Sequence, residues 1–218
     1  MDLGFLINFL EMHNTPVVTK RYHTYLTYYG LEEQYTYVLK KGIIKTSIIL
    51  KDGREFNISY ICVPNIISLL KDEVSKYTSS PFNVRIESQK AIFYKIPRVT
   101  FWKYVHSNIQ LQRYINQYYR CELSKSIHNQ QIMTMNSKKG AVCAFLYSLI
   151  NKFGKREKIG YLIDFPITNE DIGGFCGIST RNSVNRILHE LKKEKVIDIE
   201  DQKIHILDVD YLFGFVLH

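Results

Sequence analysis

The C-terminal third of the chain contains the stretch that decides its architecture, Ile167-Thr-Asn-Glu-Asp-Ile-Gly-Gly-Phe-Cys-Gly-Ile-Ser-Thr-Arg-Asn-Ser-Val-Asn-Arg-Ile-Leu188. Thr168 is a favourable helix N-cap, and the two acids that follow it suit the positive first turn of a helix that ends near Gly177. Apolar residues then return at three- and four-residue spacing from Val184 onward, which is the period of a second helix. The stretch therefore predicts two short helices joined by a glycine-containing turn.

This helix pair lies inside a larger C-terminal unit, which we assign to residues 137–218. A helix is predicted over Lys138–Phe153 and a short strand over Gly160–Phe165, which Pro166 ends. After the helix pair, Val196–Ile199 and Ile204–Leu207 are predicted to form a hairpin. This order of elements is typical of a winged helix-turn-helix domain that binds DNA.

The second helix of the pair has a polar face suited to the major groove, which is wide enough to admit an α-helix. Arginine commonly bonds guanine and asparagine adenine, so we expect Arg186 to read a guanine and Arg181 to reach a base or a phosphate. A merely solvated face is the alternative, but it does not explain why acids are absent from the helix until Glu190. The predicted DNA-binding residues all carry hydrogen-bond donors, namely Thr168, Ser179, Thr180, Arg181, Asn182, Ser183, Asn185, Arg186, Lys192 and Lys193.

Residues 1–97 are predicted to form a small β-barrel or sandwich. Tyrosine and β-branched residues are dense from Tyr22 to Ile96, with turn signals at regular intervals. The strongest of these turns, Asp52-Gly53, is the dipeptide favoured in type I′ hairpins. The individual strand predictions are Tyr35–Leu39, Ile43–Leu50, Asn83–Ser88 and Ala91–Ile96.

Residues 98–136 are predicted to form a long helix of about 25–30 residues and a linker between the two units, because they start after Pro97 and contain neither glycine nor proline. The helix carries an apolar stripe that either lies on the chain's own barrel or packs against its twin in a second chain. We assign the stripe to a dimer interface made by Leu111, Ile115, Tyr118, Tyr119, Leu123 and Ile127.

The net charge, the spacing of the cysteines and the hydropathy limit the partners and the location that the protein can have. The net charge of +8 fits a polyanionic partner, although residues 138–218 carry 12 basic and 11 acidic side chains, so charge alone does not locate a DNA-binding surface. Four scattered cysteines, without metal-ligand spacing, are expected to be reduced and mostly buried. The start of the chain does not resemble a signal peptide and no apolar run is long enough to span a membrane, so we expect a cytoplasmic protein without a membrane partner.

The quoted stretch resembles the DNA-binding domain of the CRP/FNR regulators. It shows the family's Thr-x-x-(Glu/Asp)-Ile-(Gly/Ala) opening, central glycine and Val-x-Arg-Ile-Leu segment, and it continues into the matching exit at Leu191–Ile197. Tyr37–Gly42 and Lys51–Glu55 are similar to two hairpins of the family's barrel, and the spacing is most similar to that of the PrfA-like branch.

The resemblance implies an α+β fold with a jelly-roll barrel of the cyclic-nucleotide-binding type, a long dimerisation helix and a winged helix-turn-helix. It also implies a homodimer that binds palindromic double-stranded promoter DNA, with RNA polymerase as a further partner.

The chain departs from the family at the nucleotide site. Cyclic-nucleotide binders carry a Gly-Glu pair followed by an Arg-(Ser/Ala) pair, and neither is present in Cys62–Lys71 or Tyr77–Asn83. A buried phosphate without an arginine fork would be poorly compensated, so we expect no cyclic AMP. An iron–sulfur cluster is not expected because the N-terminal cysteine cluster is missing, and haem is not expected either. A small-molecule effector remains possible and its identity is left open.

Two other functions stay open. The barrel could bind a ligand while the helix-turn-helix binds a protein, in which case the chain would show no salt-dependent affinity for duplex DNA. An enzyme is the second alternative, but no nucleophile–base pair stands at a readable spacing, no phosphate-binding loop is present, and the seven histidines are dispersed.

Overall fold

The computed structural model describes residues 3–62, 64–70, 78–135, 137–201 and 203–216. The chain divides into two compact units, Met1–Ile49 with Ile58–Ser124 and Leu50–Asn57 with Lys125–His218. The segments expected to hold a nucleotide clamp include residues 63, 71 and 77, which lie outside the described residues.

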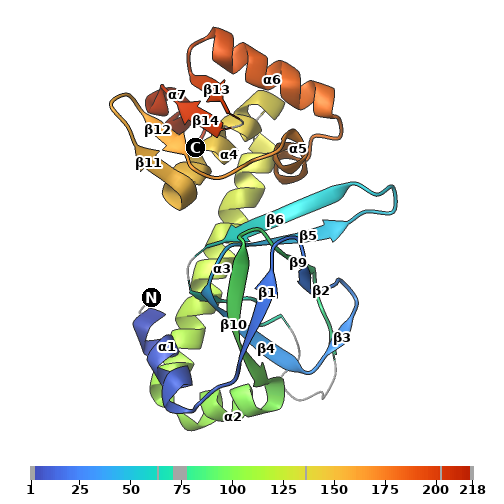
Figure 1. Ribbon diagram of the computed structural model, residues 1–218, viewed down its shortest axis with the longest axis vertical. Helices are drawn as coiled ribbons and strands as arrows, with labels where there is room; N and C mark the ends of the chain where they lie inside the picture. Colours follow the sequence, from blue (N-terminus) through green and yellow to red (C-terminus); the bar gives the residue numbers. More distant parts are fainter. Residues whose placement is uncertain (1–2, 63, 71–77, 136, 202, 217–218) are drawn as a thin grey trace. The chain divides into compact units, whose positions relative to one another are not determined.

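Two four-stranded sheets dominate the N-terminal unit (Figure 1). The first contains, in order, β1 (Val17–Arg21), β10 (Lys90–Pro97), β4 (Tyr35–Lys41) and β7 (Asn65–Ile66). The second contains β2 (Tyr25–Thr27), β9 (Asn83–Ile86), β5 (Ile44–Ile49) and β6 (Glu55–Ile61), and β3 (Glu32–Glu33) pairs separately with β8 (Thr78–Ser79).

Apolar side chains from both large sheets meet in one core, in which Leu39 and Phe93 come from the first sheet and Ile44, Val84 and Ile86 from the second. The sequence therefore predicts this part of the fold correctly as a jelly roll. Among the described residues the two sheets are not joined by hydrogen bonds into a closed barrel, so the arrangement is a sandwich.

The Asp52-Gly53 turn differs in type from the prediction. The Gly53 N–H donates to the carbonyl of Leu50 (2.9 Å), and the Leu50 N–H donates to the carbonyl of Arg54 (2.8 Å). Gly53 has a positive φ of +83°, whereas Asp52 does not, and a type I′ turn requires positive φ at both central residues. The type I′ prediction is wrong because the Asp52 carboxylate accepts the Arg54 N–H (3.1 Å), which favours a turn centred one residue earlier and closed by a left-handed glycine.

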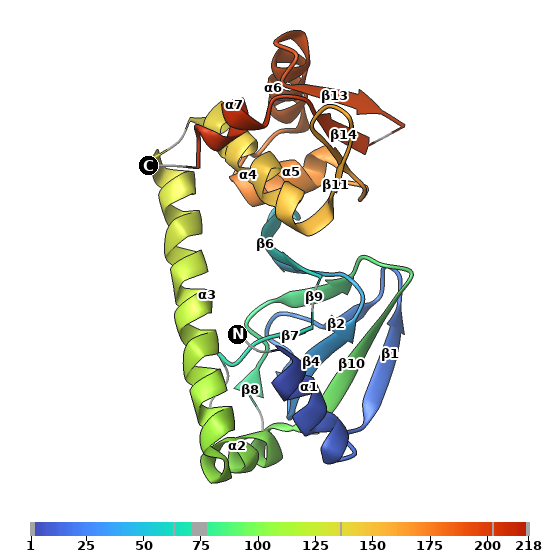
Figure 2. The same cartoon turned by 90° about the vertical axis from the view of Figure 1, so that its left-hand side faces the viewer.

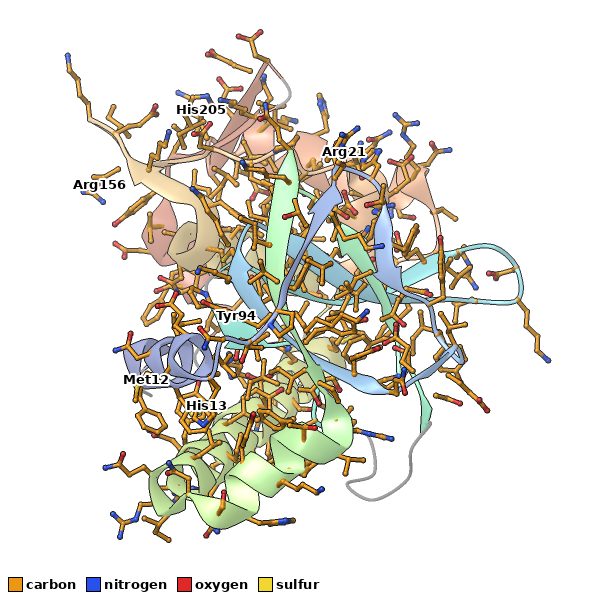
Figure 3. All side chains as sticks on the ribbon, turned by 60° about the horizontal axis from the view of Figure 1, so that its bottom comes forward. Met12, His13, Arg21, Tyr94, Arg156 and His205 are labelled. Carbon is orange, nitrogen blue, oxygen red and sulfur yellow. The ribbon has the colours of Figure 1, made fainter. Side chains whose placement is uncertain are left out.

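A second core forms where three helices meet the first sheet. α1 (Leu3–Met12) and α2 (Arg98–Ser107) lie at the same end of the sheets in both views (Figures 1 and 2). Leu6, Phe101 and Leu111 are fully buried in this core. The Tyr94 hydroxyl of β10 donates to the Glu11 carboxylate of α1 (2.9 Å), close to the end of α1 at Met12 (Figure 3). The sequence analysis did not predict α1.

The long helical region predicted over residues 98–136 is broken at Asn108. The break separates α2 from α3 (Ile109–Met135), and Asn108 itself has an extended backbone (φ −130°, ψ 109°). Its side-chain oxygen accepts the N–H groups of Gln110 (2.9 Å) and Leu111 (3.0 Å), as the N-cap of a new helix does. The 27 residues of α3 confirm the predicted length of about 25–30 residues. The predicted start of the helix just after Pro97 is wrong, because an asparagine can start a new helix without help from glycine or proline.

The residues of the predicted dimer stripe on α3 differ in how far they are buried. Leu111, Ile115 and Tyr118 are at most 5% exposed and lie in the second core of their own chain. Since these three side chains have almost no surface left for a partner, their assignment to a dimer interface is corrected. Tyr119, Leu123 and Ile127 are exposed. Their role in a dimer interface stays a prediction.

The C-terminal unit has the predicted order of elements, starting with α4 (Lys138–Phe153), which has the bounds predicted for it. The remaining elements are β11 (Gly154–Arg156), β12 (Tyr161–Ile163), α5 (Asn169–Cys176), α6 (Arg181–Lys193), β13 (Ile197–Glu200), β14 (Lys203–Ile206) and α7 (Val209–Phe213). The sheet has the order β11-β12-β14-β13, and β11 and α7 are the two elements that the sequence did not predict. Within the described part of the chain, no helix is both long and apolar enough to cross a membrane.

Candidate nucleic-acid interface

The start of α5 is fixed by a reciprocal capping box. The hydroxyl of Thr168 accepts the N–H of Asp171 (3.0 Å), and the Asp171 carboxylate accepts the N–H of Thr168 (3.2 Å). The Thr168 hydroxyl also donates to the same carboxylate (2.7 Å). The sequence predicted this cap, and the geometry commits the Thr168 side chain to it, so a DNA contact by that side chain remains only a prediction.

The helix pair is joined by a tight turn. Gly177 ends α5 in the left-handed conformation (φ +64°, ψ +25°), which glycine adopts at low cost. Thr180 then caps α6, and its hydroxyl accepts the Ser183 N–H (3.4 Å) and donates to the Ser183 hydroxyl (2.8 Å). Thr180, and not Ser179, is therefore the N-cap of α6, and the hydroxyls of Thr180 and Ser183 are partners of each other.

α5 is held against α4 by an aromatic pair. The ring of Phe175 stacks on that of Phe145 with their centroids 4.7 Å apart, and Ile172 is fully buried beside them. Ile172 and Phe175 therefore brace α5 against the core of the unit. α5 is therefore a rigid base for the helix that follows it.

α6 has one buried face and one exposed face. Val184, Ile187, Leu188 and Leu191 are buried, as the spacing predicted. The exposed residues of the helix before Glu190 are all hydrogen-bonding types, namely Arg181, Asn182, Asn185, Arg186 and His189. The arrangement presents a row of donors on a helix whose other face is fixed in the core.

The C-terminal end of α6 is tied to the rest of the unit. The Lys139 ammonium of α4 pairs with the Glu194 carboxylate (2.7 Å), and the Tyr211 hydroxyl of α7 donates to the same carboxylate (3.1 Å). The hydrogen bond from Lys139 holds the pKa of Glu194 below its ordinary value. These contacts limit how far α6 can move relative to α4 and α7.

Several basic side chains near the hairpin are engaged by acids of the same unit. Lys192 pairs with Asp198 of β13 (2.6 Å), which lowers the pKa of that carboxyl. Lys155 and Lys203 both pair with Asp164, and hydrogen bonds from these two lysines, Lys155 first, lower the pKa of Asp164 to about 2. Lys193 is exposed and has no ion-pair partner among the described residues. Of the two lysines of α6 that are predicted to bind DNA, it is therefore the one that no described acid of the unit engages.

The strands β11 and β12, which continue the sheet beside β14 of the hairpin, show the same internal pairing. On β14 the His205 ring contacts the Glu157 carboxylate (3.2 Å), and the Arg156 guanidinium lies 4.9 Å from the centre of the Tyr161 ring (Figure 3). These polar side chains of the sheet therefore have partners within the unit. The helix pair α5–α6 is the better candidate for a DNA-binding surface.

Two residues of α5 that the sequence did not single out contact the predicted DNA-binding residues. The Glu170 carboxylate lies 3.4 Å from Nη1 of Arg181, and the Asn169 side-chain amide donates to the side-chain oxygen of Asn185. The sequence had assigned Glu170 only to the favourable first turn of α5. No spacing rule predicts these pairs, because each pair joins two helices through the Gly177 turn.

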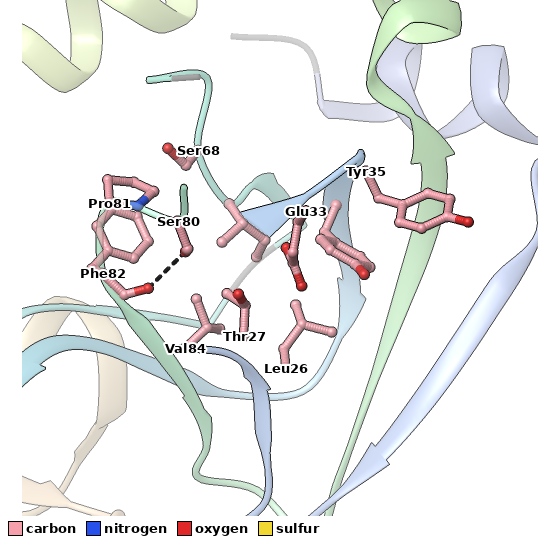
Figure 4. A pocket seen from close by; sticks show the side chains of 11 residues that line it. Leu26, Thr27, Glu33, Tyr35, Ser68, Ser80, Pro81, Phe82 and Val84 are labelled. Atoms are coloured by element: carbon pink, nitrogen blue, oxygen red, sulfur yellow. Dashed lines mark hydrogen bonds between the residues drawn. The ribbon is translucent and has the colours of Figure 1, made fainter. Parts of the chain in front are cut away.

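The sandwich of the N-terminal unit contains a small cavity near the segment where a nucleotide clamp was sought (Figure 4). Leu26, Thr27, Ser80 and Phe82 line it, and the Ser80 hydroxyl donates to the Phe82 carbonyl (2.8 Å). The hydroxyl oxygen of Thr27 is buried and has no hydrogen-bond partner among the described residues. The described lining contains no arginine or lysine, and Glu33 contributes a carboxylate, so the cavity does not suit a phosphate.

The four cysteines carry free thiols. Cys143 is buried, whereas Cys62, Cys121 and Cys176 are half-buried, so the expectation of mostly buried thiols holds for one residue only. Desolvation raises the pKa of both Cys143 and Cys176 to about 12. These two thiols therefore stay protonated, and protonated thiols are poor nucleophiles and poor metal ligands.

Comparison with known proteins agrees with this description of the C-terminal unit. Residues 140–213 match the Crp-like helix-turn-helix domain. The chain is 58% identical over 97% of its length to the lactate racemization regulatory protein of Lactiplantibacillus plantarum, of which the match covers 96%. It is 26% identical over 83% of its length to the listeriolysin regulatory protein of Listeria monocytogenes, of which the match covers 76%.

Solved structures show the same fold over nearly the whole chain. FixK2 from Bradyrhizobium japonicum superposes with a TM-score of 0.78 at 15% identity, covering 92% of this chain and 96% of that one. A CRP-family transcriptional regulator of Thermus thermophilus superposes with a TM-score of 0.74 at 14% identity, covering 91% of this chain and 96% of that one.

Proposed function

The chain belongs to the CRP/FNR family of transcriptional regulators and is a DNA-binding regulator of transcription, and we propose that it acts as a homodimer on palindromic promoter DNA. The exposed face of α6 supports this proposal most directly, because Asn182, Asn185 and Arg186 project from a helix that is fixed in its core and capped at its start. A two-fold dimer would present two such helices to two half-sites of one operator. RNA polymerase would be its further partner, in the cytoplasm, where the DNA of its bacterial relatives lies.

We propose that the regulated genes serve lactate racemization. The support is the 58% identity over 97% of the chain to the regulator of L. plantarum that carries this name. A role in regulation rather than catalysis fits the other relatives too, since they are named as regulatory proteins.

We also propose that any effector is a small molecule other than a cyclic nucleotide. The described lining of the cavity combines hydroxyls and aromatic rings with one carboxylate, and burial raises the pKa of the Tyr37 hydroxyl. The carboxylate would repel a phosphodiester, and the neutral hydroxyls would leave it without a counter-charge.

Sequencing the genomic fragments that the purified protein retains tests the proposed target. We expect enrichment of fragments upstream of lactate-racemization genes, and deletion of the regulator gene should change lactate racemase activity in cell extracts. The Arg186→Ala variant serves as the matched control for retention. Retention of a reproducible sequence motif that lies elsewhere in the genome would keep the DNA-binding function and overturn the lactate assignment.

A further inference from the structure

We infer that Glu170 is a positioning residue that makes Arg181 a reader of bases rather than an anchor on phosphates. The inference rests on the proposed recognition of DNA by α6 and does not depend on which genes are regulated. Glu170 lies in the first turn of α5, and its carboxylate faces the guanidinium of Arg181 at the first turn of α6 (3.4 Å).

The backbone on both sides of this ion pair is held in place. Glu170 stands between Asn169, whose amide is bonded to Asn185, and Asp171, which belongs to the capping box. Arg181 directly follows Thr180, the N-cap of α6. The two side chains are exposed, but the atoms from which they extend are fixed, so the entropy cost of forming the pair is smaller than for two free surface residues.

The direction of the pair decides what Arg181 can contact. Arg181 and Asn185 are four residues apart and therefore lie on the same side of α6, the side that faces the start of α5. Asn182 and Arg186 occupy the next side of the helix by the same spacing. Glu170 thus holds the Arg181 guanidinium beside the row formed by Asn182 and Arg186.

A guanidinium has enough donors for two partners at once. Of its five N–H groups, those on Nη1 face Glu170, and the others remain for the two acceptors of a guanine edge. A phosphate would compete poorly for the same guanidinium, because its negative charge would approach the Glu170 carboxylate. The carboxylate therefore favours a neutral base edge over the DNA backbone as the partner of Arg181.

An acid on a DNA-facing surface normally weakens binding to every duplex. Glu170 differs from Glu190, the first acid of α6, because Glu190 is exposed and forms no ion pair among the described residues. Glu170→Gln and Glu190→Gln remove the same charge from neighbouring helices, so the second variant is a matched control for the first.

The test measures affinity for an operator and for a random duplex, each at several salt concentrations. The operator is first selected from a random library with the wild-type protein, so failure to select any sequence would contradict the DNA-binding function and not this inference. We expect Glu170→Gln to bind random duplex about threefold to fivefold more tightly, with a salt slope steeper by about one, and to gain nothing on the operator. The ratio of specific to random affinity should fall by the same factor, while circular dichroism shows unchanged folding.

Two further measurements separate positioning from a general charge effect. In an Arg181→Ala background, Glu170→Gln should no longer change the ratio, because the residue that Glu170 positions is gone. Glu190→Gln should tighten both duplexes alike and leave the ratio unchanged. The inference is overturned if Glu170→Gln behaves as Glu190→Gln does, or if its effect on the ratio persists without Arg181.

Discussion

α6 and α3 both carry apolar residues at three- and four-residue spacing, yet the two helices use that face differently. In α6 the whole apolar stripe is buried within its own unit, with Val184 and Leu191 fully covered. In α3 the stripe runs from a fully buried Leu111 to a Leu123 that is 62% exposed. Periodicity therefore shows that a helix has an apolar face, but it does not show what covers that face.

The largest expected effect separates the two halves of the α3 stripe. Leu111→Ala should lower the free energy of unfolding by about 2–5 kcal/mol, because it leaves a cavity in a packed core. Leu123→Ala should change it by less than about 0.5 kcal/mol, because the side chain is exposed in the single chain. Urea unfolding measures the free energy of unfolding of both variants, at a protein concentration low enough to dissociate any dimer. Equal losses would mean that the exposed half of α3 is covered by its own chain in solution.

The exposed half of the stripe is the place to test the dimer. Leu123→Glu combined with Ile127→Glu puts two unpaired carboxylates from each chain into the predicted interface, which should weaken the dimer at least about hundredfold. Sedimentation should then show a shift toward monomer. Ser124→Glu combined with His128→Glu, which adds acids beside the stripe at the same spacing, should leave the dimer intact. A wild-type sedimentation pattern for the first variant would contradict the interface.

A smaller effect separates the predicted DNA-binding residues that cap a helix from those that do not. Thr168→Ala removes the N-cap of α5 and should cost about 1 kcal/mol of unfolding free energy. Ser179→Ala, in the turn before α6, removes a hydroxyl that caps neither helix and should cost almost nothing. Thermal unfolding compares the two variants. If Ser179→Ala proved as costly as Thr168→Ala, the capping box would not be the reason for the loss.

The sequence predicts α4, the Thr168 cap, the Gly177 turn and the hairpin because each depends on residues close together in the chain. It does not predict α1, since only Asn8 and Glu11 mark the polar face among ten mostly apolar residues, and two positions are too few to establish a period. It misses the break at Asn108 because asparagine is compatible with a helix and with its cap. It misses the pairs of Asn169 and Glu170 because their partners lie on the next helix, and only the folded turn brings them together.

The smallest expected effect concerns the N-terminal sandwich. Isothermal titration calorimetry with cyclic AMP should show no site tighter than about 1 mM, because the described lining of the cavity offers a phosphate no arginine or lysine. Addition of cyclic AMP should likewise leave the affinity for the operator unchanged. A micromolar site would show that the nucleotide is bound by residues outside this lining.

The central claim is that α6 reads DNA sequence, and a binding titration of Arg186→Ala against the operator and its single-base variants tests it most directly. Arg186 is exposed on the side of the helix opposite the buried stripe. The variant should lose about 1–3 kcal/mol on the operator and its preference at one base pair in each half-site, while random duplex is bound almost as before. Lys193→Ala, the control for a phosphate contact, should weaken all duplexes alike and reduce the salt slope by about one. An equal loss on operator and random duplex for Arg186→Ala would contradict base reading by this residue and leave it as an anchor on the DNA backbone.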